Sequence, residues 1–416
     1  MPADGRTRVI YVTARLPFAD GEPFIVPEIV QLVEDGCDVT VVPVRTGGDV
    51  AHADALRLVP RTARVPLLSG TVLWGALVQT VRAPASVARA FFTLRASRSV
   101  RIFLKNLAVF PKAVWLARHA RGLGAEHIHA HWASTPATVA LIAAQISDVP
   151  WSLTAHRWDI AEDNLLRTKA RRACFVRVIS AHGAEELRGF VGDPEWSPWL
   201  LYVGVRLPAV RRSDSGAGAP LRVLTAARLV EEKGHVYLLE AVRLLKERRV
   251  SLHVELAGDG PLDRALRQRA AELGVEDDVL FLGRVSHEAL LTEMSGGRWD
   301  VSTLPSIVEG LPISLVEAMA CGVPAVGTET GGVPELLGDG AGLLVHPRDA
   351  EALADALELL SRDATVRASF AQRGRARVEG EFSVERIAAA LHARFRDCSV
   401  DERRRRPMSS DRFARP

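Results

Sequence analysis

Two glutamates stand eight residues apart in a stretch whose residue types could bind an anionic ligand. Glu309 opens the sequence EGLPISLVE, and Glu317 ends it. An apolar run (299–304) precedes the stretch and a helix is predicted after it, so free backbone N–H groups would lie at the helix start. Glu309 would lie in the loop and Glu317 inside the helix. Carboxylates placed this way could contact opposite ends of a sugar nucleotide, which has hydroxyls at both ends and a diphosphate between them.

The wider segment, residues 305–324 followed by GGVPE at 331–335, resembles the E-x7-E signature of family 4 glycosyltransferases. These are retaining enzymes of the GT-B fold that use nucleotide-activated sugars, and the resemblance extends over residues 8–395. It implies that Glu317 accepts hydrogen bonds from the nucleotide ribose. It also implies that the donor sugar and its phosphate are held by Glu309, Gly310, Leu311, Pro312 and Ile313.

Two cations, Arg228 and Lys233, follow the first predicted strand of the second half of the chain, in ARLVEEKG. An isolated Arg/Lys pair of this kind is usually a solvated turn. Upstream of Glu309, the segment resembles the family's Gly-Arg-Leu-x(n)-Lys-Gly motif, which implies donor phosphate binding, although Ala227 replaces the first glycine. By the same resemblance, Arg284 and Val285 are expected to lie in the donor site.

Cleavage of a glycosyl phosphate places negative charge on the departing phosphate, so charge stabilisation is the main catalytic requirement. Many sugar-nucleotide transferases use a divalent metal on an Asp-x-Asp motif, but no two aspartates of this sequence are spaced in that way. With the Arg/Lys pair, this favours metal-independent transfer without a cofactor. A front-face mechanism, in which the departing phosphate helps to deprotonate the acceptor, is expected.

Histidines cluster at the ends of two predicted strands. His156, in TAHRWDI, resembles the family's Thr-x-His-x-x-Asp-Ile motif, whose histidine contacts the donor sugar near the reaction centre. We therefore expect His156 and Glu309 to be the catalytic residues. His127, His129 and His131 alternate along a strand and would share one face, which could suggest a metal. No carboxylate or cysteine completes such a site nearby, so we expect no metal and regard His131 as an acceptor-side candidate.

The loop after the first predicted strand, residues 13–29, lacks the Gly-Gly pair of many family members. It is similar instead to the Pro-x(n)-Glu-Thr-Phe-Ile version found in a subset associated with exopolysaccharide and colanic acid assembly. Pro23 stands where that version has threonine. Glu22 is the second acceptor-side candidate.

Apolar strand-like runs alternate with helical stretches along both halves, which predicts α/β domains with parallel, doubly wound sheets. The resemblance implies a GT-B arrangement, with a cleft between two Rossmann-like domains. The expected parts are an N-terminal acceptor-side domain (1–207), a linker (208–220), a nucleotide-sugar-binding domain (221–383), a helix crossing back to the first domain (384–400) and a disordered basic tail (401–416).

The 416 residues carry a net charge of +3, but the basic residues are unevenly distributed. No acidic residue lies between Asp54 and Glu126, while arginines and lysines accumulate there, with Pro84 and Pro111 expected to break the stretch into pieces. Segment 82–121 could contact an anionic membrane surface or a lipid-linked acceptor, or be only a solvated basic face. Nucleic acid is not expected, because no binding module accompanies the charge.

Four widely spaced cysteines indicate neither a zinc site nor a disulfide framework. The N-terminus enters an apolar strand without a long apolar signal region, which favours a cytoplasmic protein. The basic segment would allow a peripheral position on the inner face of the cell membrane.

The sequence as a whole predicts a retaining, metal-independent glycosyltransferase. It would move a sugar from a nucleotide sugar to a lipid-linked or saccharide acceptor in bacterial exopolysaccharide or cell-surface glycan synthesis. Two alternatives remain: a catalytically idle scaffold that binds sugar nucleotides or glycans, and a GT-B sugar-nucleotide epimerase. Turnover by the purified protein would distinguish the scaffold, and the Glu309/Glu317 array argues against the epimerase.

Overall fold

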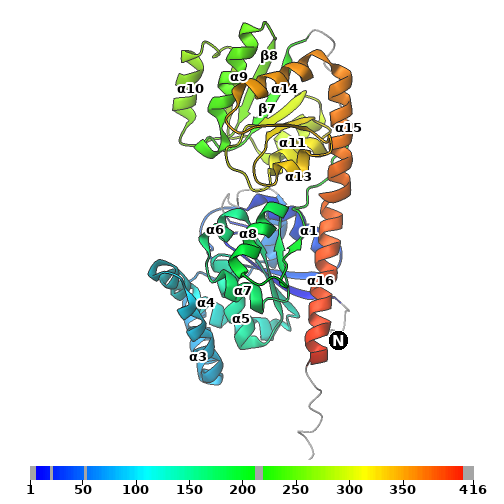
Figure 1. Cartoon of the computed structure of the whole chain (residues 1–416). Helices are drawn as coiled ribbons and strands as arrows, with labels where there is room; N and C mark the ends of the chain where they lie inside the picture. The colour runs from blue at the N-terminus through cyan, green and yellow to red at the C-terminus, as the bar shows by residue number, and fades with distance from the viewer. Residues whose placement is uncertain (1–5, 19–21, 51–53, 211–218, 406–416) are drawn as a thin grey trace, which may run out of the picture. The chain divides into compact units, whose positions relative to one another are not determined.

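The chain folds into two compact units, each built on a parallel six-stranded sheet (Figure 1). The computed structural model describes residues 6–18, 22–50, 54–210 and 219–405, with residues 400–405 described by their backbone alone. Unit 1 comprises residues 1–178, 184–201 and 387–416, and unit 2 comprises residues 179–183 and 202–386. The predicted α/β class with doubly wound parallel sheets is confirmed.

The sheet of unit 1 has the strand order β2-β1-β3-β4-β5-β6, with every neighbouring pair parallel. Its strands are β1 (Arg8–Thr13), β2 (Asp38–Pro43), β3 (His127–His131), β4 (Trp151–Ala155), β5 (Val176–Val178) and β6 (Trp199–Leu200). Because β1, β3 and β4 are adjacent and parallel, their carboxyl ends meet at one edge of the sheet. The two predicted acceptor-side or catalytic histidines lie at this edge.

The two faces of this sheet differ in polarity, because alternate residues of a strand point to opposite faces. Ile10, Ile128 and Leu153 belong to a large apolar core that also includes residues of α4 (Val100–Leu123) and α5 (Thr135–Ser147). The other face carries the histidines of β3, which contact Phe175 and Phe395. Phe395 belongs to the C-terminal helix α16 (Val384–Arg405), which covers this face within unit 1.

The helices of unit 1 include a long one in the basic segment. They are α1 (Val26–Glu34), α2 (Gly70–Arg82), α3 (Pro84–Thr93), α4 (Val100–Leu123), α5 (Thr135–Ser147), α6 (Arg157–Glu162), α7 (Leu166–Arg172) and, from Ala184 on, most of α8 (Ala181–Val191). Short 3₁₀ turns are η1 (Pro23–Ile25), η2 (Asp54–Arg61) and η3 (Leu94–Ala96).

Two expectations for the basic segment are wrong. Pro111 lies inside α4 and does not interrupt it, although a proline there removes one helical hydrogen bond. The helix residues that follow Pro111 pack into the apolar core through Ala113, Leu116 and Ala117, and this packing maintains the helix. Lys112 is fully buried and donates hydrogen bonds to the carbonyls of residues 43, 44 and 65, so it is not part of a cationic surface.

Unit 2 repeats the same architecture with the strand order β12-β11-β10-β7-β8-β9. Its strands are β7 (Leu221–Ala226), β8 (Leu252–Ala257), β9 (Val279–Gly283), β10 (Val301–Leu304), β11 (Ala325–Thr328) and β12 (Leu343–Val345). Its helices are η4 (Glu231–Lys233), α9 (His235–Glu247), α10 (Asp263–Glu272), α11 (His287–Ser295), α12 (Ile313–Ala320), α13 (Val333–Leu337), α14 (Ala350–Arg362) and α15 (Ala364–Glu381).

Both faces of the second sheet are covered at β7 and β10, whose residues are mostly buried, whereas His253 of β8 and Leu280 of β9 are exposed. Val223 of β7 packs in a core shared with α9, α10 and α14, whereas the next residue, Leu224, packs with α11 and α12 on the opposite face. A strand buried on both sides cannot alternate polar and apolar residues. Its ends are therefore the places where polar groups can gather.

The ends of the predicted segments differ from the observed ones. Helix α16 runs to Arg405, so the first five residues of the predicted tail (401–416) are helical. Residues 406–416 lie outside the described part of the chain, as do residues 211–218 of the predicted linker.

Candidate functional site

The predicted site residues form two sets, one in each unit: the donor-binding set lies in unit 2, and His156, His131 and Glu22 lie in unit 1. In unit 2, Lys233 and Glu309 form an ion pair of 2.5 Å between Nζ and Oε2, with both side chains mostly buried. Lys233 ends η4, after β7, and Glu309 lies in the loop after β10. Adjacent parallel strands thus bring together two residues 76 positions apart in the sequence.

The Glu309 carboxylate has further partners within its own loop. Ser306 Oγ donates to Oε2 (3.1 Å), and the backbone N–H of Gly310 donates to Oε1 (3.1 Å). The loop is also pressed against Gly331, which has a φ of +55° and where a Cβ would lie 1.9 Å from the Glu309 carbonyl oxygen. No other residue fits there. The glycine pair of the sequence motif therefore fixes the backbone of the Glu309 loop.

Helix α12 begins directly after this loop, and no side chain caps its N-terminus. Glu317 lies within the helix, as predicted, and its Oε1 is 2.6 Å from Nε2 of His287. His287 opens α11, and sequence reasoning did not select it, because a single histidine in a loop–helix junction carries no motif signal. Leu311 of the loop is buried.

The remaining predicted donor residues lie at the ends of β7 and β9. Arg228 is exposed, and its backbone carbonyl accepts from His235 (3.0 Å). The turn after Lys233 approaches β10 closely, since a Cβ on Gly234 would lie 2.0 Å from the Pro305 carbonyl oxygen. Arg284 forms an exposed ion pair with Asp259 (3.1 Å), and the half-buried Val285 packs against the core. The structure thus joins Lys233 to Glu309 directly, while Glu317 and Arg284 contact other partners.

In unit 1, the Nε2 atoms of His131 and His156 lie 2.7 Å apart. His131 ends β3, and His156 follows β4, the neighbouring strand. Burial lowers the pKa of His156 to about 3 and that of His131 well below its usual value, so both rings are neutral at pH 7. A hydrogen bond between two neutral imidazoles requires one ring to donate and the other to accept.

The direction of that bond follows from a buried chain of partners. Arg177 pairs with Glu28 (2.6 Å), Glu28 accepts from the Tyr11 hydroxyl (2.5 Å), and the Tyr11 oxygen lies 3.1 Å from His131 Nδ1. Because the Tyr11 proton is directed to Glu28, Tyr11 must accept from His131 Nδ1–H. His131 Nε2 is then the acceptor, and His156 carries its proton on Nε2.

Sequence reasoning missed this chain of partners. Arg177 is fully buried in β5 and its Nε also donates to the Leu201 carbonyl (2.8 Å), while Glu28 lies in α1. A charged residue inside the apolar run VRV was the one available signal, since a buried arginine needs a paired acid. The partner, almost 150 residues away, could not be chosen from the sequence.

Glu22 is buried and its carboxylate orders the loop after β1. Its oxygens accept from the backbone N–H groups of residues 14, 15 and 16 (2.6–3.0 Å) and from Trp132 Nε1 (2.5 Å). Trp132 has a φ of +93°, an uncommon conformation for a large residue, and its ring lies on His156 with 4.3 Å between centroids. Glu22 thus positions the ring that covers His156, whereas a direct contact of Glu22 with an acceptor stays a prediction.

The other two histidines of β3 are bonded to hydroxyls of β4. His127 Nε2 and His129 Nδ1 contact Ser152 Oγ (2.7 and 2.8 Å), and His129 Nε2 contacts Thr154 Oγ1 (3.0 Å). Among the described residues, no group of three His, Cys, Asp or Glu side chains is arranged to hold a metal ion. Interstrand hydrogen bonds account for the alternation of histidines in β3.

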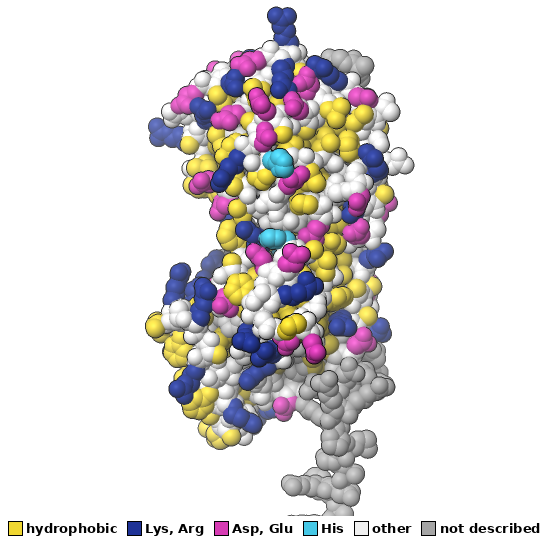
Figure 2. Space-filling model, viewed as in Figure 1, with side chains coloured by type: hydrophobic (Ala, Val, Ile, Leu, Met, Phe, Trp, Pro, Cys, Tyr) yellow, Lys and Arg dark blue, Asp and Glu magenta, His cyan; other side chains and the backbone are white. Residues whose placement is uncertain are grey.

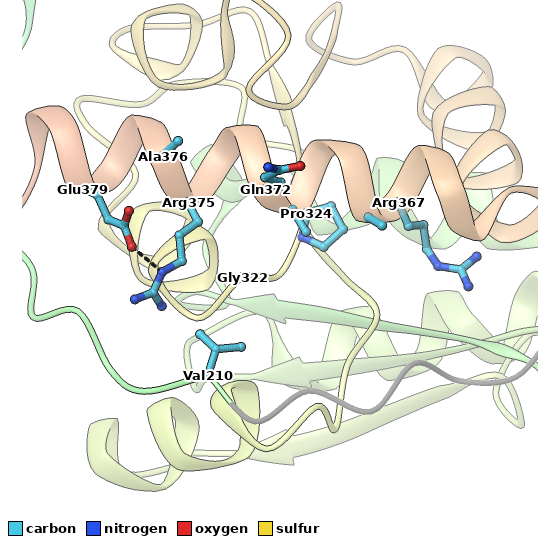
Figure 3. A pocket seen from close by; sticks show the side chains of 10 residues that line it. Val210, Gly322, Pro324, Arg367, Gln372, Arg375, Ala376 and Glu379 are labelled. Atoms are coloured by element: carbon cyan, nitrogen blue, oxygen red, sulfur yellow. Dashed lines mark hydrogen bonds and ion pairs between the residues drawn. The ribbon is translucent and has the colours of Figure 1, made fainter.

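A groove of about 730 Å³ in unit 2 lies apart from these residues (Figure 3). It is lined by the α15 side chains of Arg367, Gln372, Arg375 and Glu379, and by Pro324, which precedes β11. Ligands of open parallel sheets bind at the carboxyl ends of the strands. Pro324 is at the amino end of its strand, so this groove is not part of the candidate donor site.

Residues 211–377 match the family model described as Glycosyl transferases group 1. The chain is 39% identical over 191 residues to WcaL of Escherichia coli (strain K12), named for colanic acid biosynthesis; the match covers 43% of this chain and 46% of WcaL. It is 28% identical over 323 residues to a D-inositol 3-phosphate glycosyltransferase of Corynebacterium jeikeium (strain K411), covering 69% and 76% of the two chains. The chain thus spans about half the length of WcaL.

Among solved structures, the crystal structure of Anabaena Alr3699/HepE in complex with UDP matches with a TM-score of 0.70 at 20% identity. The match covers 94% of this chain and 100% of HepE. A likeness at this identity concerns the fold, and it confirms the predicted GT-B class.

Proposed function

Because residues 211–377 form a glycosyl transferases group 1 domain, we propose that the whole chain is a retaining, metal-independent glycosyltransferase. It transfers a sugar from a nucleotide sugar to a lipid-linked or saccharide acceptor in bacterial exopolysaccharide or cell-surface glycan synthesis. The Lys233–Glu309 pair beside the uncapped start of α12 carries the proposal. It places a cation, a carboxylate and backbone N–H groups at one sheet edge, where a glycosyl diphosphate needs all three.

The chemistry follows from the charges that develop during transfer. The bond between the anomeric carbon and the phosphate oxygen breaks, and Arg228, Lys233 and the start of α12 stabilise the negative charge on the departing diphosphate. The acceptor oxygen forms its bond to the same face of the anomeric carbon, and its proton passes to the departing phosphate oxygen. Glu309 holds donor sugar hydroxyls, and Glu317 accepts from the ribose hydroxyls.

Donor binding must rearrange the ion pair. Lys233 Nζ is paired with Glu309 Oε2 at 2.5 Å. A diphosphate would compete for the ammonium group and free the carboxylate for sugar hydroxyls. We therefore expect the functions of Lys233 and Glu309 to be coupled, so that substitution of either residue also disturbs the role of the other in donor binding.

The test is a screen of UDP-, GDP- and dTDP-linked sugars for thermal stabilisation and slow hydrolysis by the purified protein, with EDTA present. UDP-glucose is the first donor to try, since HepE has been solved with it. Stabilisation and turnover by one nucleotide class in EDTA support the proposal and identify the base. A requirement for a divalent metal would contradict metal independence. Binding without turnover in the presence of acceptors would favour the scaffold alternative.

We also propose that unit 1 attaches to an anionic membrane surface on the cytoplasmic side. Bulky apolar side chains of α2, α3 and α4 are exposed, among them Trp74 (66%), Phe92 (57%) and Leu104 (56%). Basic side chains lie between them over the part of unit 1 where Figure 1 labels α3 and α4 (Figure 2). An apolar surface with cations suits an interfacial position. No described helix has both the length and the hydropathy that crossing a bilayer requires.

A further inference from the structure

We propose that a second pocket, in unit 1, binds the acceptor and selects a sugar that carries an anionic group. The pocket has a volume of about 510 Å³ and is lined by Arg98, Arg101 and Lys105 on one side and Trp132, Trp158 and Asp159 on the other. The inference rests on the proposed transferase function and adds the acceptor class to it. The residues selected from sequence for the acceptor, Glu22 and His131, do not line this pocket.

Those two residues are poorly suited to direct contact. Glu22 and His131 are almost fully buried. The Glu22 oxygens already accept four hydrogen bonds, and both His131 ring nitrogens are engaged within the protein. A ligand would have to break these bonds to reach them, and buried polar groups left unpaired are costly. Exposed groups of this unit are therefore better placed than Glu22 and His131 to contact the acceptor.

The aromatic lining suits a sugar ring. Trp158 lines the pocket and has 60% of its surface exposed, which is unusual for a large aromatic side chain. The C–H face of a pyranose is apolar and slightly positive, so it packs well against the negative face of an indole. Trp132 contributes a second indole, which is held in place by Glu22.

The cationic side of the pocket suits a phosphate or a carboxylate. Arg98 pairs with Asp163 at 3.6 Å with more than half of its side chain exposed, so this pair is weak and can be replaced. Lys105 pairs with Glu162 (2.5 Å). Arg101 is exposed and has no ion-pair partner within the described ranges. Asp163 and Glu162 thus each pair with one of the three cations, and Arg101 is the cation of this pocket that can meet a ligand anion without breaking an ion pair among the described residues.

The pocket adjoins the predicted catalytic residue. The Trp132 ring that lines it packs against His156 at 4.3 Å between centroids. Asp159, another lining residue, accepts from the backbone N–H of His156 (2.6 Å). A sugar bound between the tryptophans would thus lie beside the Trp132 ring that contacts His156.

The test uses three soluble probes: glucose 1-phosphate, glucuronate and the neutral methyl α-glucoside. Binding to the full chain is followed by NMR through the indole N–H signals of Trp132 and Trp158. We expect at least one anionic probe to shift both signals and the neutral probe to bind tenfold or more weakly. Comparison of the phosphate with the carboxylate identifies the source of the anion. Arg101→Gln should weaken anionic binding tenfold or more, while Arg167→Gln, at an exposed arginine of α7 outside the pocket, should not.

Equal binding of the neutral probe, or unchanged binding by Arg101→Gln, would overturn the inference. So would failure of all soluble probes together with vesicle binding that Arg101→Gln abolishes, which would assign these cations to a membrane. Donor hydrolysis by the wild-type protein separates this failure from that of the proposed function. If the protein hydrolyses the donor but binds no probe, only the assignment of the pocket to the acceptor is wrong. If it binds a probe but turns over no donor, the pocket is a glycan-binding site of a protein that is not a transferase.

Discussion

The ring nitrogens of His131 and His156 share one proton across 2.7 Å, and the Arg177–Glu28–Tyr11 chain determines which ring holds it. His156 carries its proton on Nε2, so its Nδ1 is left as an acceptor. A histidine that contacts a donor sugar must present a defined donor or acceptor. The buried charges of unit 1 thus specify the chemical form of a predicted catalytic residue.

Removing the Tyr11 hydroxyl should make the tautomer of His156 less well defined. In Tyr11→Phe, His131 Nδ1–H has no acceptor, so the alternative tautomers become accessible. Loss of one hydrogen bond of about 1 kcal/mol corresponds to a decrease of roughly five- to tenfold in transfer. Long-range ¹H–¹⁵N NMR should show one tautomer of His156 in the wild type and a mixture in the variant. Ser361→Ala, which also removes one bonded hydroxyl, is the control. A single unchanged tautomer in Tyr11→Phe would contradict the derivation.

Lys233→Ala and Glu309→Gln should each lower transfer by about 10²-fold or more, because each removes charge stabilisation or sugar positioning at the reaction centre. Circular dichroism and thermal unfolding would verify that the fold survives. Lys246→Ala is the matched control, since Lys246 forms an exposed pair with Asp278 in the same unit. Near-normal turnover in both site variants would show that the donor site lies elsewhere.

Glu317→Gln should mainly weaken nucleotide binding. Hydrogen bonds to a charged group contribute about 1.5–3 kcal/mol, so we expect a 10- to 100-fold higher dissociation constant for the nucleotide and a smaller change in kcat at saturating donor. Isothermal titration with the nucleoside diphosphate measures it, and Glu293→Gln, exposed in the neighbouring α11, is the control. An unchanged dissociation constant with a collapsed kcat would assign Glu317 to the chemical step instead.

Acid should destabilise unit 1. Burial lowers the pKa of His127 and His156 to about 3, and those of His129 and His131 well below 6.5. Below pH 6.5 the unfolded chain binds protons at these rings and the folded chain does not, so stability falls as the pH falls. Asp159 acts in the opposite direction, because burial raises its pKa to about 7. Because four histidine rings act against one carboxyl, the free energy of unfolding should fall as the pH is lowered from 6.5 to 5.

Thermal unfolding at pH 7.0 and pH 5.5 measures this dependence. His127→Phe should reduce it, because one titrating ring is lost, and a phenyl ring can pack beside Phe175 and Phe395. His346→Phe, at an exposed position of unit 2, is the control. A melting temperature that does not change between the two pH values would show that these histidines are protonated in the folded protein.

Membrane binding should depend on both the apolar and the basic side chains of α3 and of η3, which follows it. Each basic residue near an anionic bilayer contributes about 1 kcal/mol, so the double change Arg89→Gln with Arg95→Gln should weaken vesicle binding about 30-fold. Phe92→Ser should weaken vesicle binding further, and added salt should weaken vesicle binding by the wild-type protein. Sedimentation with vesicles that contain anionic lipid measures this. Arg264→Gln with Arg267→Gln, on α10 of unit 2, is the control pair, and equal losses in both pairs would refute a specific surface.

Local patterns in the sequence were enough to predict the two parallel sheets and the position of the Glu309 loop. Apolar runs separated by helical stretches fit few folds other than parallel α/β sheets. Glu317 lies inside α12 because this helix begins directly after the Glu309 loop. Short strands such as β6 and β12 were not predicted, since two or three residues give no periodic signal. Pro111 misled the prediction because tertiary packing of α4 outweighs one missing hydrogen bond.

The contacts around His156 could not be predicted for a different reason. Arg177, Glu28 and Tyr11 come from three separate elements, and only the strand order and register bring them to His131. The same holds for His287 beside Glu317. A motif identifies a residue that acts on a ligand, whereas the residues that orient it leave no common spacing in the sequence.

The chain passes between the two units at residues 178/179, 183/184, 201/202 and 386/387. Within unit 2, Glu335 accepts from the backbone N–H of Ala181 (2.7 Å), and Arg375 donates to the Pro208 carbonyl (3.0 Å), so the segment 211–377 is fastened by residues that precede it. A gene fragment that encodes only this segment would lack part of its own fold. Recombination that exchanges this domain between related proteins would therefore have to carry residues 179–183, 202–210 and the start of α16 along with it.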